Sequence, residues 1–439
     1  MKRRFFIVST LLSLTLSLVA HAGTTWTTPE IIIDEAASYV SMAIDKNDKI
    51  HIIYHFSSGT KGYLKYATNA TGAWESTMVG SGTSLEYGKY SSIAIDSNGG
   101  VHISYGSFGG TTGLAYAYME AGKAWVIDII YYAEIKSSSI AVDSNGKVHI
   151  AYITGDKLKY ITKSNTWSIT PIAGNVTSAS LAIDSNNNPN ISFYDNVEKN
   201  IKHAVLSATG LQLTAVDGNN ANTADVSNFI SIVPDNKQYI AYKFSTTIVP
   251  SVYGLKHAMY VPSSQTWTLK TVKSGDYGVS DIHIVVDSNG KSHISYKMTP
   301  NSLKPLIKKL KYATNSSGAW ISEIVGPLKT VVGGNTIGLD SKGNVHLVFV
   351  NDSNRLVHTT PDADGDGVAV ASDNCKDTAN ADQADADADG TGDACDSTPN
   401  GDPNITGGTN EPPPVLATED GSSSEDSGGG GGGGCSLVR

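Results

Sequence analysis

Cysteine and arginine are scarce in this chain of 439 residues. The three cysteines all follow residue 370, so the main part of the chain must fold without disulfide bonds. Beyond the first four residues the only arginines are Arg355 and Arg439. This argues against a sialidase, because such enzymes hold the substrate carboxylate with several arginines. There is also no basic patch of the kind that binds nucleic acid, so no nucleic-acid partner is expected.

Long apolar runs are missing after the N-terminus. Met1-Lys-Arg-Arg is followed by an apolar run from Phe5 to Ala20 and by Ala20-His21-Ala22, which predicts a signal peptide at residues 1–22. No later run reaches the roughly 18 apolar residues that span a bilayer. We therefore expect an exported protein, secreted or held at the cell surface, with no transmembrane segment in the mature chain.

Familiar catalytic motifs are absent as well. The sequence contains no Gly-x-Ser-x-Gly, no His-Glu-x-x-His and no glycine-rich phosphate loop. Paired carboxylates for glycoside hydrolysis cannot be assigned from sequence alone. No catalytic residue is therefore predicted, and the sequence favours a binding protein over an enzyme without deciding between them.

Acidic residues gather at one end of the chain. From residue 361 onward there are 17 acidic and 2 basic residues, whereas residues 23–360 hold 25 acidic and 27 basic residues. The net charge of −10 therefore belongs to a separate C-terminal part, and the main body is close to neutral.

The main body repeats one pattern, which is clearest in Ser92-Ile-Ala-Ile-Asp-Ser-Asn-Gly-Gly-Val-His-Ile-Ser-Tyr105. Apolar residues alternate on both sides of an Asn-Gly turn, which indicates a β-hairpin. We call the aspartate before the turn the anchor. Its seven positions are spaced 41 to 54 residues apart: Asp45, Asp96, Asp143, Asp184, Val233 (in a divergent copy), Asp287 and Asp340. Seven repeats of this length are typical of the four-stranded blades of a β-propeller.

Other residues keep step with the anchor. Six residues after it stand His51, His102, His149, Asn190, Tyr239, His293 and His346, and nine after it stand Tyr54, Tyr105, Tyr152, Phe193, Tyr242, Tyr296 and Phe349. A third strand follows, as in Leu64-Lys-Tyr-Ala, and a fourth begins near a tryptophan in most copies. Because such residues are spread around a ring, we interpret them as packing positions rather than as one site.

The last repeat ends without a tryptophan strand, while Trp26 stands alone before the first repeat. The sequence therefore predicts an all-β, seven-bladed β-propeller over residues 23–360, in which an N-terminal strand completes the seventh blade. Closure of this kind leaves no open sheet edge between the first and last blades.

Residues outside the periodic positions are the better candidates for a propeller site. They include His55 and His283 and seven tyrosines: Tyr87, Tyr90, Tyr131, Tyr132, Tyr253, Tyr260 and Tyr277. Exposed aromatic rings pack well against the apolar face of a sugar, so a glycan-binding face is one interpretation, and ordinary packing is the other. The repeat resembles those of seven-bladed propeller proteins exported by bacteria, a resemblance that implies architecture and no particular activity.

The acidic part contains two stretches that fit the twelve-residue frame of calcium loops. In the first, the predicted ligands are Asp362, Asp364, Asp366, the carbonyl of Val368, and Asp373. In the second, they are Asp385, Asp387, Asp389, Thr391, Asp393 and Asp396. No helical pattern flanks either stretch, so they are not a pair of EF-hands.

Residues 373–396 follow the pattern of a thrombospondin type 3 repeat closely, with Lys376 where that family often has proline. The resemblance implies that Ca²⁺ organises residues 361–397 and that Cys375 is bonded to Cys395. Export would permit that disulfide.

Residues 398–439 are rich in proline, glycine and serine and predict a flexible tail. The end, from Gly434, resembles the start of a bacterial C-terminal sorting tail, and Cys435 is a candidate anchor, a free thiol or a chance occurrence. The favoured function is surface binding or adhesion to a glycan or to a matrix or surface protein. The alternative is an extracellular carbohydrate-active enzyme, either a polysaccharide lyase or a glycoside hydrolase.

Overall fold

The computed structural model describes residues 25–400 except 83–86, 108–111, 219–226, 247–251, 277, 300–307, 327–330, 363, 365, 367, 369–371 and 377. The predicted signal peptide at 1–22, Cys435 and all of the predicted tail after residue 400 lie outside the described residues. The described residues form β-strands and no helix, so this part of the chain has no helix that could cross a membrane.

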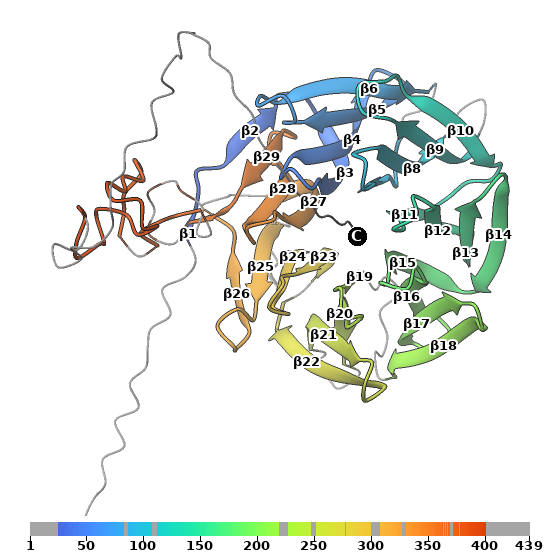
Figure 1. The fold of residues 1–439 in the computed structure, drawn as a ribbon. Coiled ribbons are helices and arrows are strands. Elements are labelled where there is room, and N and C mark those ends of the chain that lie inside the picture. The colour runs from blue at the N-terminus through green and yellow to red at the C-terminus, as the bar shows by residue number, and fades with distance from the viewer. Residues whose placement is uncertain are drawn as a thin grey trace, which may run out of the picture.

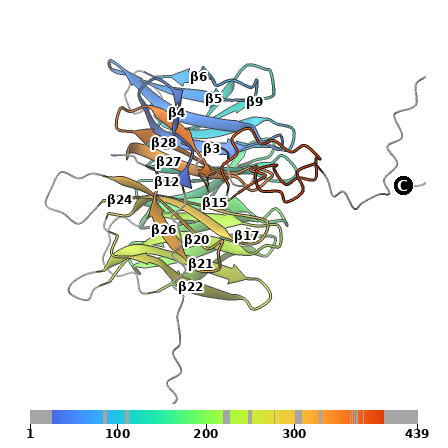
Figure 2. The same cartoon turned by 90° about the vertical axis from the view of Figure 1, so that its left-hand side faces the viewer.

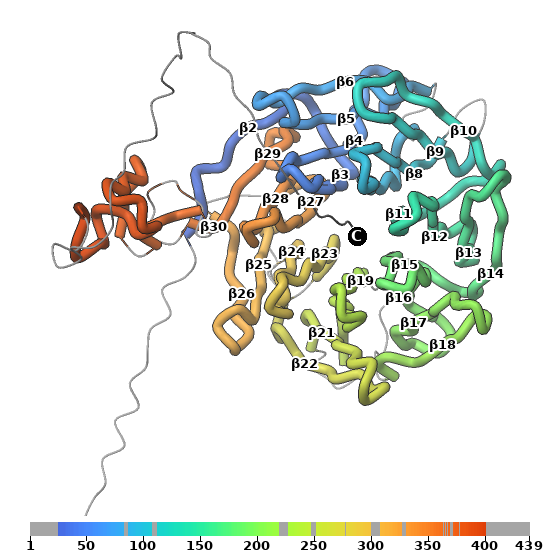
Figure 3. The backbone as a smooth tube through the Cα atoms, viewed as in Figure 1, coloured from blue at the N-terminus to red at the C-terminus, as the bar shows by residue number. Residues whose placement is uncertain are grey.

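Seven antiparallel sheets of four strands surround a central axis (Figure 1, with the backbone alone in Figure 3), which confirms the seven-bladed β-propeller. Blade 1 comprises β3 (Ala37–Ile44), β4 (Ile50–Ser58), β5 (Lys61–Thr68) and β6 (Glu75–Ser81). Blade 2 comprises β7 (Ser92–Ile95), β8 (Val101–Ser107), β9 (Gly113–Met119) and β10 (Val126–Tyr131). Blade 3 comprises β11 (Ser137–Val142), β12 (Val148–Thr154), β13 (Lys157–Lys163) and β14 (Trp167–Ala173).

The second half of the ring has the same order. Blade 4 comprises β15 (Val176–Ile183), β16 (Pro189–Asp195), β17 (Asn200–Ser207) and β18 (Gly210–Asp217). Blade 5 comprises β19 (Asn228–Ile232), β20 (Gln238–Ser245), β21 (Tyr253–Val261) and β22 (Thr266–Ser274). Blade 6 comprises β23 (Ser280–Val286), β24 (Ser292–Met298), β25 (Lys309–Thr314) and β26 (Ile321–Ile324). In each blade the first strand lies nearest the axis and the fourth lies at the rim (Figure 1).

Blade 7 is built from both ends of the propeller. It contains β27 (Val331–Leu339), β28 (Val345–Asn351) and β29 (Leu356–Thr359), and its fourth strand is β2 (Glu30–Ile33), which pairs with β29. A further short strand, β1 (Thr25–Trp26), pairs with β30 (Pro361–Asp362). The predicted closing strand is thus confirmed in one respect and refined in another, since it is divided in two on either side of Thr27–Pro29. Proline removes the N–H that a continuous strand would need there.

The six tryptophans occupy equivalent places at six of the seven interfaces between blades. Each ring packs near the third-strand aromatic of the preceding blade, with ring centroids 5.1 to 6.3 Å apart: Trp26 on Tyr312, Trp74 on His358, Trp125 on Tyr66, Trp167 on Tyr116, Trp267 on His203 and Trp320 on His257. Trp26 therefore occupies the same place between blades 6 and 7 that the other five occupy elsewhere.

The core lies between blades rather than inside one domain centre. For example, Ile53 and Leu64 of blade 1 pack in one cluster with Ile93 and Ile103 of blade 2. Tyrosines nine residues after the anchor, such as Tyr105, are fully buried there. Because one blade covers the apolar face of the next, no blade is complete without both neighbours.

The anchor turns are tight and structural. Asp96 Oδ1 accepts hydrogen bonds from the N–H groups of Asn98 and Gly100, both at 2.8 Å, and Gly99 has the positive φ that the turn requires. Blade 1 has Asp48 at the glycine position, and its carboxylate accepts hydrogen bonds from the backbone N–H and the hydroxyl of Ser341 in blade 7. The turns therefore also join the two ends of the ring.

We expect Trp26→Ala to lower the free energy of unfolding by about 2 kcal/mol, somewhat less than for a fully buried tryptophan. Its matched control is Trp125→Ala, which removes the same contact between blades 1 and 2 and should cost a similar amount. Urea unfolding followed by circular dichroism measures both. A neutral Trp26→Ala beside a destabilised Trp125→Ala would contradict closure of the ring through Trp26.

Candidate functional site

The two faces of the ring differ in their connections. The turns between the first and second strands all have five residues: 45–49, 96–100, 143–147, 184–188, 233–237, 287–291 and 340–344. On the opposite face, the connections between the second and third strands range from two residues (155–156) to ten (299–308). Figure 2 shows the ring edge-on, so that the two faces lie on opposite sides of it. Binding residues are carried mostly by variable connections on a rigid scaffold, which directs attention to this opposite, variable face.

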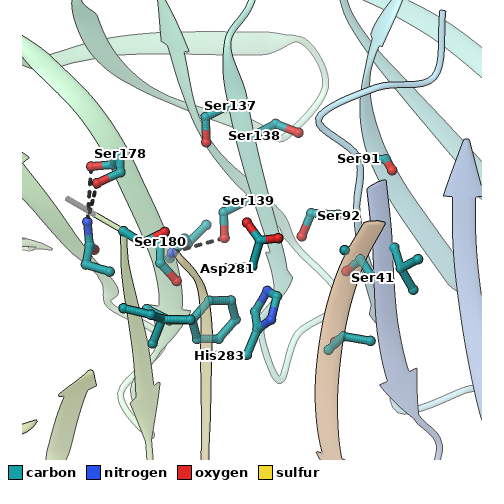
Figure 4. A pocket seen from close by; sticks show the side chains of 18 of the residues that line it. Ser41, Ser91, Ser92, Ser137, Ser138, Ser139, Ser178, Ser180, Asp281 and His283 are labelled. Atoms are coloured by element: carbon teal, nitrogen blue, oxygen red, sulfur yellow. Dashed lines mark hydrogen bonds between the residues drawn. The ribbon is translucent and has the colours of Figure 1, made fainter. Parts of the chain in front are cut away.

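The first strands enclose a central channel of about 1020 Å³. Serine hydroxyls line much of it, among them Ser41, Ser91, Ser92, Ser137, Ser138, Ser139, Ser178 and Ser180 (Figure 4). The serines that stand four residues before an anchor join neighbouring blades. The Oγ atoms of Ser92, Ser139 and Ser180 accept hydrogen bonds from the backbone N–H groups of Ile140, Leu181 and Ile230 in the next blade.

Blade 7 keeps the hydroxyl with Thr336 in place of serine, whereas blades 5 and 6 break the ring of hydroxyls. Phe229 and His283 stand at the position four before the anchor, with ring centroids 4.7 Å apart in an edge-on arrangement. Burial lowers the pKa of His283 to about 4, so its imidazole is neutral at neutral pH. Sequence reasoning placed His283 outside the periodic positions. The structure corrects this, because His283 replaces one of the repeated serines.

Tyr39, Tyr90 and Asp281 each stand six residues before an anchor, at the mouth of the channel. Their φ angles are +53°, +56° and +48°, a left-handed backbone that is costly for bulky residues. In blades 1 and 6 a β-bulge lies at this point of the first strand. The ring of Tyr39 is 39% exposed and contacts the ring of Tyr90 edge-on, with centroids 5.5 Å apart. Strain at matching positions makes this mouth the strongest candidate site in the propeller.

Charged groups lie beside Tyr39 and elsewhere in the channel lining. Lys89 Nζ lies 5.4 Å from the centroid of the Tyr39 ring, and Lys136 is an exposed residue of the channel lining. Lys297 forms an ion pair with Asp281, and its Nζ donates to the carbonyl of Gly333 at 2.9 Å. Lysines therefore outnumber carboxylates among these groups.

His55 also reaches this region, since its Nδ1 lies 2.9 Å from Ser38 Oγ and its ring is edge-on to Tyr39. The structure thus brings His55 and Tyr90, both singled out in the sequence, beside Tyr39, and places His283 lower in the same channel. Sequence reasoning missed Tyr39, Asp281 and Lys297. The shared spacing of six residues before the anchor was the signal that could have found Tyr39 and Asp281.

The other tyrosines singled out in the sequence have separate surroundings. Tyr87 is buried with its Oη 3.1 Å from Tyr105 Oη, and Tyr260 packs on Trp267 near the face that carries the anchor turns. Tyr132 is 72% exposed beside Tyr131. Tyr253 begins β21, and Tyr277 lies outside the described residues.

Buried clusters of tyrosine, carboxylate and lysine recur near the variable face. Asp217 accepts from Tyr242 Oη at 2.9 Å and from Lys256 Nζ at 2.7 Å, and Asp276 accepts from Tyr296 and Lys311 in the same way. Glu35 is bound by Tyr54 and Lys65 in blade 1. Burial and the neighbouring carboxylate raise the pKa of each tyrosine above its ordinary value. Each of these three carboxylates thus has one tyrosine and one lysine as partners.

The periodic histidines form a second recurring contact. His102 Nδ1 lies 2.8 Å from Tyr116 Oη, and its Nε2 lies 3.1 Å from the anchor Asp96. His149 repeats both contacts in blade 3, while His51 and His293 repeat the contact with tyrosine and lie within ion-pair distance of their anchors. In blade 7 the partner of His346 is His358. Their interpretation as packing and hydrogen-bonding residues is confirmed.

The acidic part begins at β30 and lies outside the ring beside β1 (Figures 1 and 3). Carboxylate oxygens of Asp362, Asp364 and Asp366 lie within 4.8 Å of one another, and so do those of Asp385, Asp387 and Asp389. Within the described residues, Asp364 Oδ2, Asp373 Oδ2 and Asp385 Oδ1 are buried without a hydrogen-bond partner. Burial and the neighbouring aspartates raise the pKa of Asp364. This donor set fits a hard cation.

The other predicted ligands lie outside these two groups of three carboxylates. Val368 and Thr391 donate backbone N–H groups to Asp366 and Asp389, a geometry typical of tight loops. Asp393 and Asp396 accept N–H groups from Ala386 and Thr398 and lie outside the group of three. The disulfide between Cys375 and Cys395 is confirmed.

Neither a protein-family model nor a curated protein matches the sequence. Among solved structures, the chain is similar to a virginiamycin B lyase from Staphylococcus aureus, with 14% identity and a TM-score of 0.48 over 76% of this chain and 98% of that one. It is similar to AofleA from Arthrobotrys oligospora, with 11% identity and a TM-score of 0.46 over 72% and 92%. It is also similar to an α-L-arabinofuranosidase from Fusarium graminearum, with 10% identity and a TM-score of 0.46 over 77% of this chain and 96% of that one. We draw nothing about ligand or reaction from identities this low.

Acid should destabilise the propeller through its buried histidines. Burial lowers the pKa of His203 and of His257 to about 4, whereas an unfolded histidine titrates at about 6.5. Between those values the unfolded chain binds protons that the folded chain does not. The free energy of unfolding therefore has no loss from these histidines above pH 6.5. It falls as the pH drops toward 4, by about 1.4 kcal/mol per pH unit for each histidine.

The variant His257→Gln removes one of these groups, so its stability should depend less steeply on pH than that of the wild type. Urea unfolding at several pH values between 7 and 4 measures the difference in slope. Parallel curves for the two proteins would show that His257 does not titrate in this way.

Proposed function

We propose that the propeller binds a glycan at the mouth of its channel and that the acidic part is an extracellular calcium-ordered segment. The observation that carries the proposal is the pair Tyr39 and Tyr90, held at the mouth by a strained backbone. An exposed tyrosine ring offers an apolar face for a sugar and a hydroxyl for its polar groups. The serine-lined channel and nearby lysines supply further donors.

This function is adhesion or recognition at the cell surface. Export, which the N-terminal sequence predicts, would place the propeller among extracellular glycans and matrix proteins. The disulfide between Cys375 and Cys395 supports an oxidising compartment. A ring of seven similar blades suits binding rather than catalysis, because its recurring histidines and the carboxylates of the clusters are already paired within the protein.

We expect Tyr39→Ala to weaken binding at least tenfold to glycans that the wild type selects on a glycan array. Tyr260→Ala is the matched control, because Tyr260 packs on Trp267 away from the channel mouth. Titration calorimetry with a selected glycan gives both affinities. Undiminished binding by Tyr39→Ala would rule out the channel mouth as the glycan site.

An extracellular carbohydrate-active enzyme is the second candidate, and the break in the serine ring favours it. The neutral imidazole of His283 and the Asp281–Lys297 pair stand in one channel. Release of reducing ends or unsaturated products from the selected glycan, measured with the wild type and with Asp281→Asn, separates an enzyme from a binding protein.

Calcium fits the acidic part, where Asp362, Asp364, Asp366, Asp373 and the carbonyl of Val368 would hold one ion. Asp385, Asp387, Asp389, Asp393, Asp396 and Thr391 would hold another. A bound divalent cation supplies the positive charge that offsets the repulsion among these carboxylates. Asp362 is only 2% exposed and belongs to β30, where it pairs with Thr25 of β1. Ordering of the first loop should therefore also stabilise the closing strands.

We expect saturating calcium to raise the unfolding temperature of the propeller and to protect residues 362–396 from proteases. A concentration one hundred times the dissociation constant stabilises a folded state by about 2.7 kcal/mol. Asp364→Asn in the first loop should abolish the gain, and Asp389→Asn in the second should retain it. Calorimetry in calcium and in chelator measures the shift. An equal gain in both variants would contradict coupling through β30.

A further inference from the structure

Blade 3 departs from the tyrosine, carboxylate and lysine clusters of blades 1, 5 and 6. It keeps the tyrosine nine after the anchor, Tyr152, and the third-strand lysine, Lys159. In the three other blades the corresponding lysines, Lys65, Lys256 and Lys311, each bind a buried or half-buried carboxylate of the chain. Lys159 has no such partner within the described residues.

A tyrosine stands close to the place that the carboxylate takes elsewhere. Lys159 Nζ donates to Tyr131 Oη at 3.0 Å and lies 4.5 Å from the centroid of the same ring. The rings of Tyr131 and Tyr152 have centroids 5.5 Å apart. Tyr152 Oη is buried and has no hydrogen-bond partner among the described residues. The blade thus keeps the donors of the cluster while lacking its negative charge.

The chain does have acidic residues near this place in the sequence, but they are exposed. Glu134 precedes its anchor by nine residues, much as Glu35 precedes its own by ten. Glu134 is exposed, and so is Asp156 in the adjacent turn. In the part of the chain that the structure describes, neither side chain forms an ion pair, so the charge of Lys159 is not offset from within.

The surroundings of Lys159 suit a sugar. Tyr132 is the adjacent exposed ring, and Lys136 follows in the same connection and lines the channel. Ser138 Oγ donates to the carbonyl of Tyr90 at 2.6 Å, which joins the first strand of blade 3 to the channel mouth. A saccharide that extends from the mouth along the connection from Lys136 to Tyr132 would therefore approach Lys159.

We infer that blade 3 carries a subsite for an acidic sugar. The carboxylate of a uronate residue accepts from Lys159 Nζ, as Glu35, Asp217 and Asp276 accept from their lysines in the other blades. It also accepts from Tyr131 Oη, which here stands beside the lysine. The exposed ring of Tyr132 covers the apolar face of the same sugar. The inference rests on the proposed glycan-binding function and adds the chemical class of the ligand.

The test uses the full chain and three tetrasaccharides: tetragalacturonate, its counterpart reduced at the carboxyl groups to galactose, and a tetragalactose sulfated at the same carbons. By titration calorimetry, the wild type should bind the uronate at least tenfold more tightly than the neutral form. Lys159→Gln should lose that preference, and Tyr132→Ala should weaken binding of the uronate several-fold. Lys147→Gln, in the turn of the same blade on the opposite face, should behave like the wild type.

Each outcome decides one level of the proposal. Equal affinity of the wild type for the uronate and the neutral form, or an undiminished preference in Lys159→Gln, would overturn the acidic subsite. Binding to neutral glycans that still depends on Tyr39 would then leave the proposed function standing. Equal binding of the sulfated tetramer would overturn the assignment of a carboxylate. Absence of binding to every glycan on the array and to all three tetramers would overturn both proposals.

Discussion

Packing of each blade against both of its neighbours is the constraint on which this structure depends. A blade buries its apolar faces only between two others, so the ring is stable only if the seventh interface forms. That interface joins the N-terminal part of the propeller to its C-terminal part. Trp26 packs on Tyr312, β2 completes blade 7, and Ser341 donates to Asp48 of blade 1. Closure thus uses the same contacts as the rest of the ring, supplied by residues about three hundred positions apart.

The same packing of neighbouring blades explains why the connections have a fixed length on one face of the ring and variable lengths on the other. The anchor turns are fixed in length because their side chains bond within the turn and to the neighbouring blade, as Asn187 does to Ser144. The opposite connections take no part in these contacts and are free to vary. The lysine–carboxylate pairs of blades 1, 5 and 6 lie near this variable face. A blade whose internal carboxylate is missing, such as blade 3, therefore leaves a charge where a ligand can approach.

Local spacing made the fold predictable. Hairpin, histidine, tyrosine and tryptophan positions all recur at set distances from the anchor, so the blade count and the role of Trp26 followed from the sequence. The partners of the lysines did not follow, because they keep no common spacing from the anchor. Glu35 and Asp276 lie in connections between blades, whereas Asp217 is the last residue of β18. The left-handed backbone of Tyr39 is likewise set by a bulge, which tertiary packing imposes. The place of His283 was missed because a histidine stands there where four other blades have serine. The disulfide was reached only through a family resemblance, and the calcium ligands stay a prediction.

Asp362 belongs both to the closing strands of the propeller and to the acidic part. Its backbone belongs to β30, where it continues the closing strand pair beyond blade 7, and its carboxylate belongs to the first acidic group. Asn344 in the last anchor turn also donates to Ser372 of the acidic part at 2.9 Å. A carboxylate held within a buried strand cannot move far from Asp364 and Asp366 to relieve repulsion. Neutralising charge at this group therefore acts on the ring closure itself, whereas the second group, which begins twenty-three residues later at Asp385, has no strand of the propeller among its members.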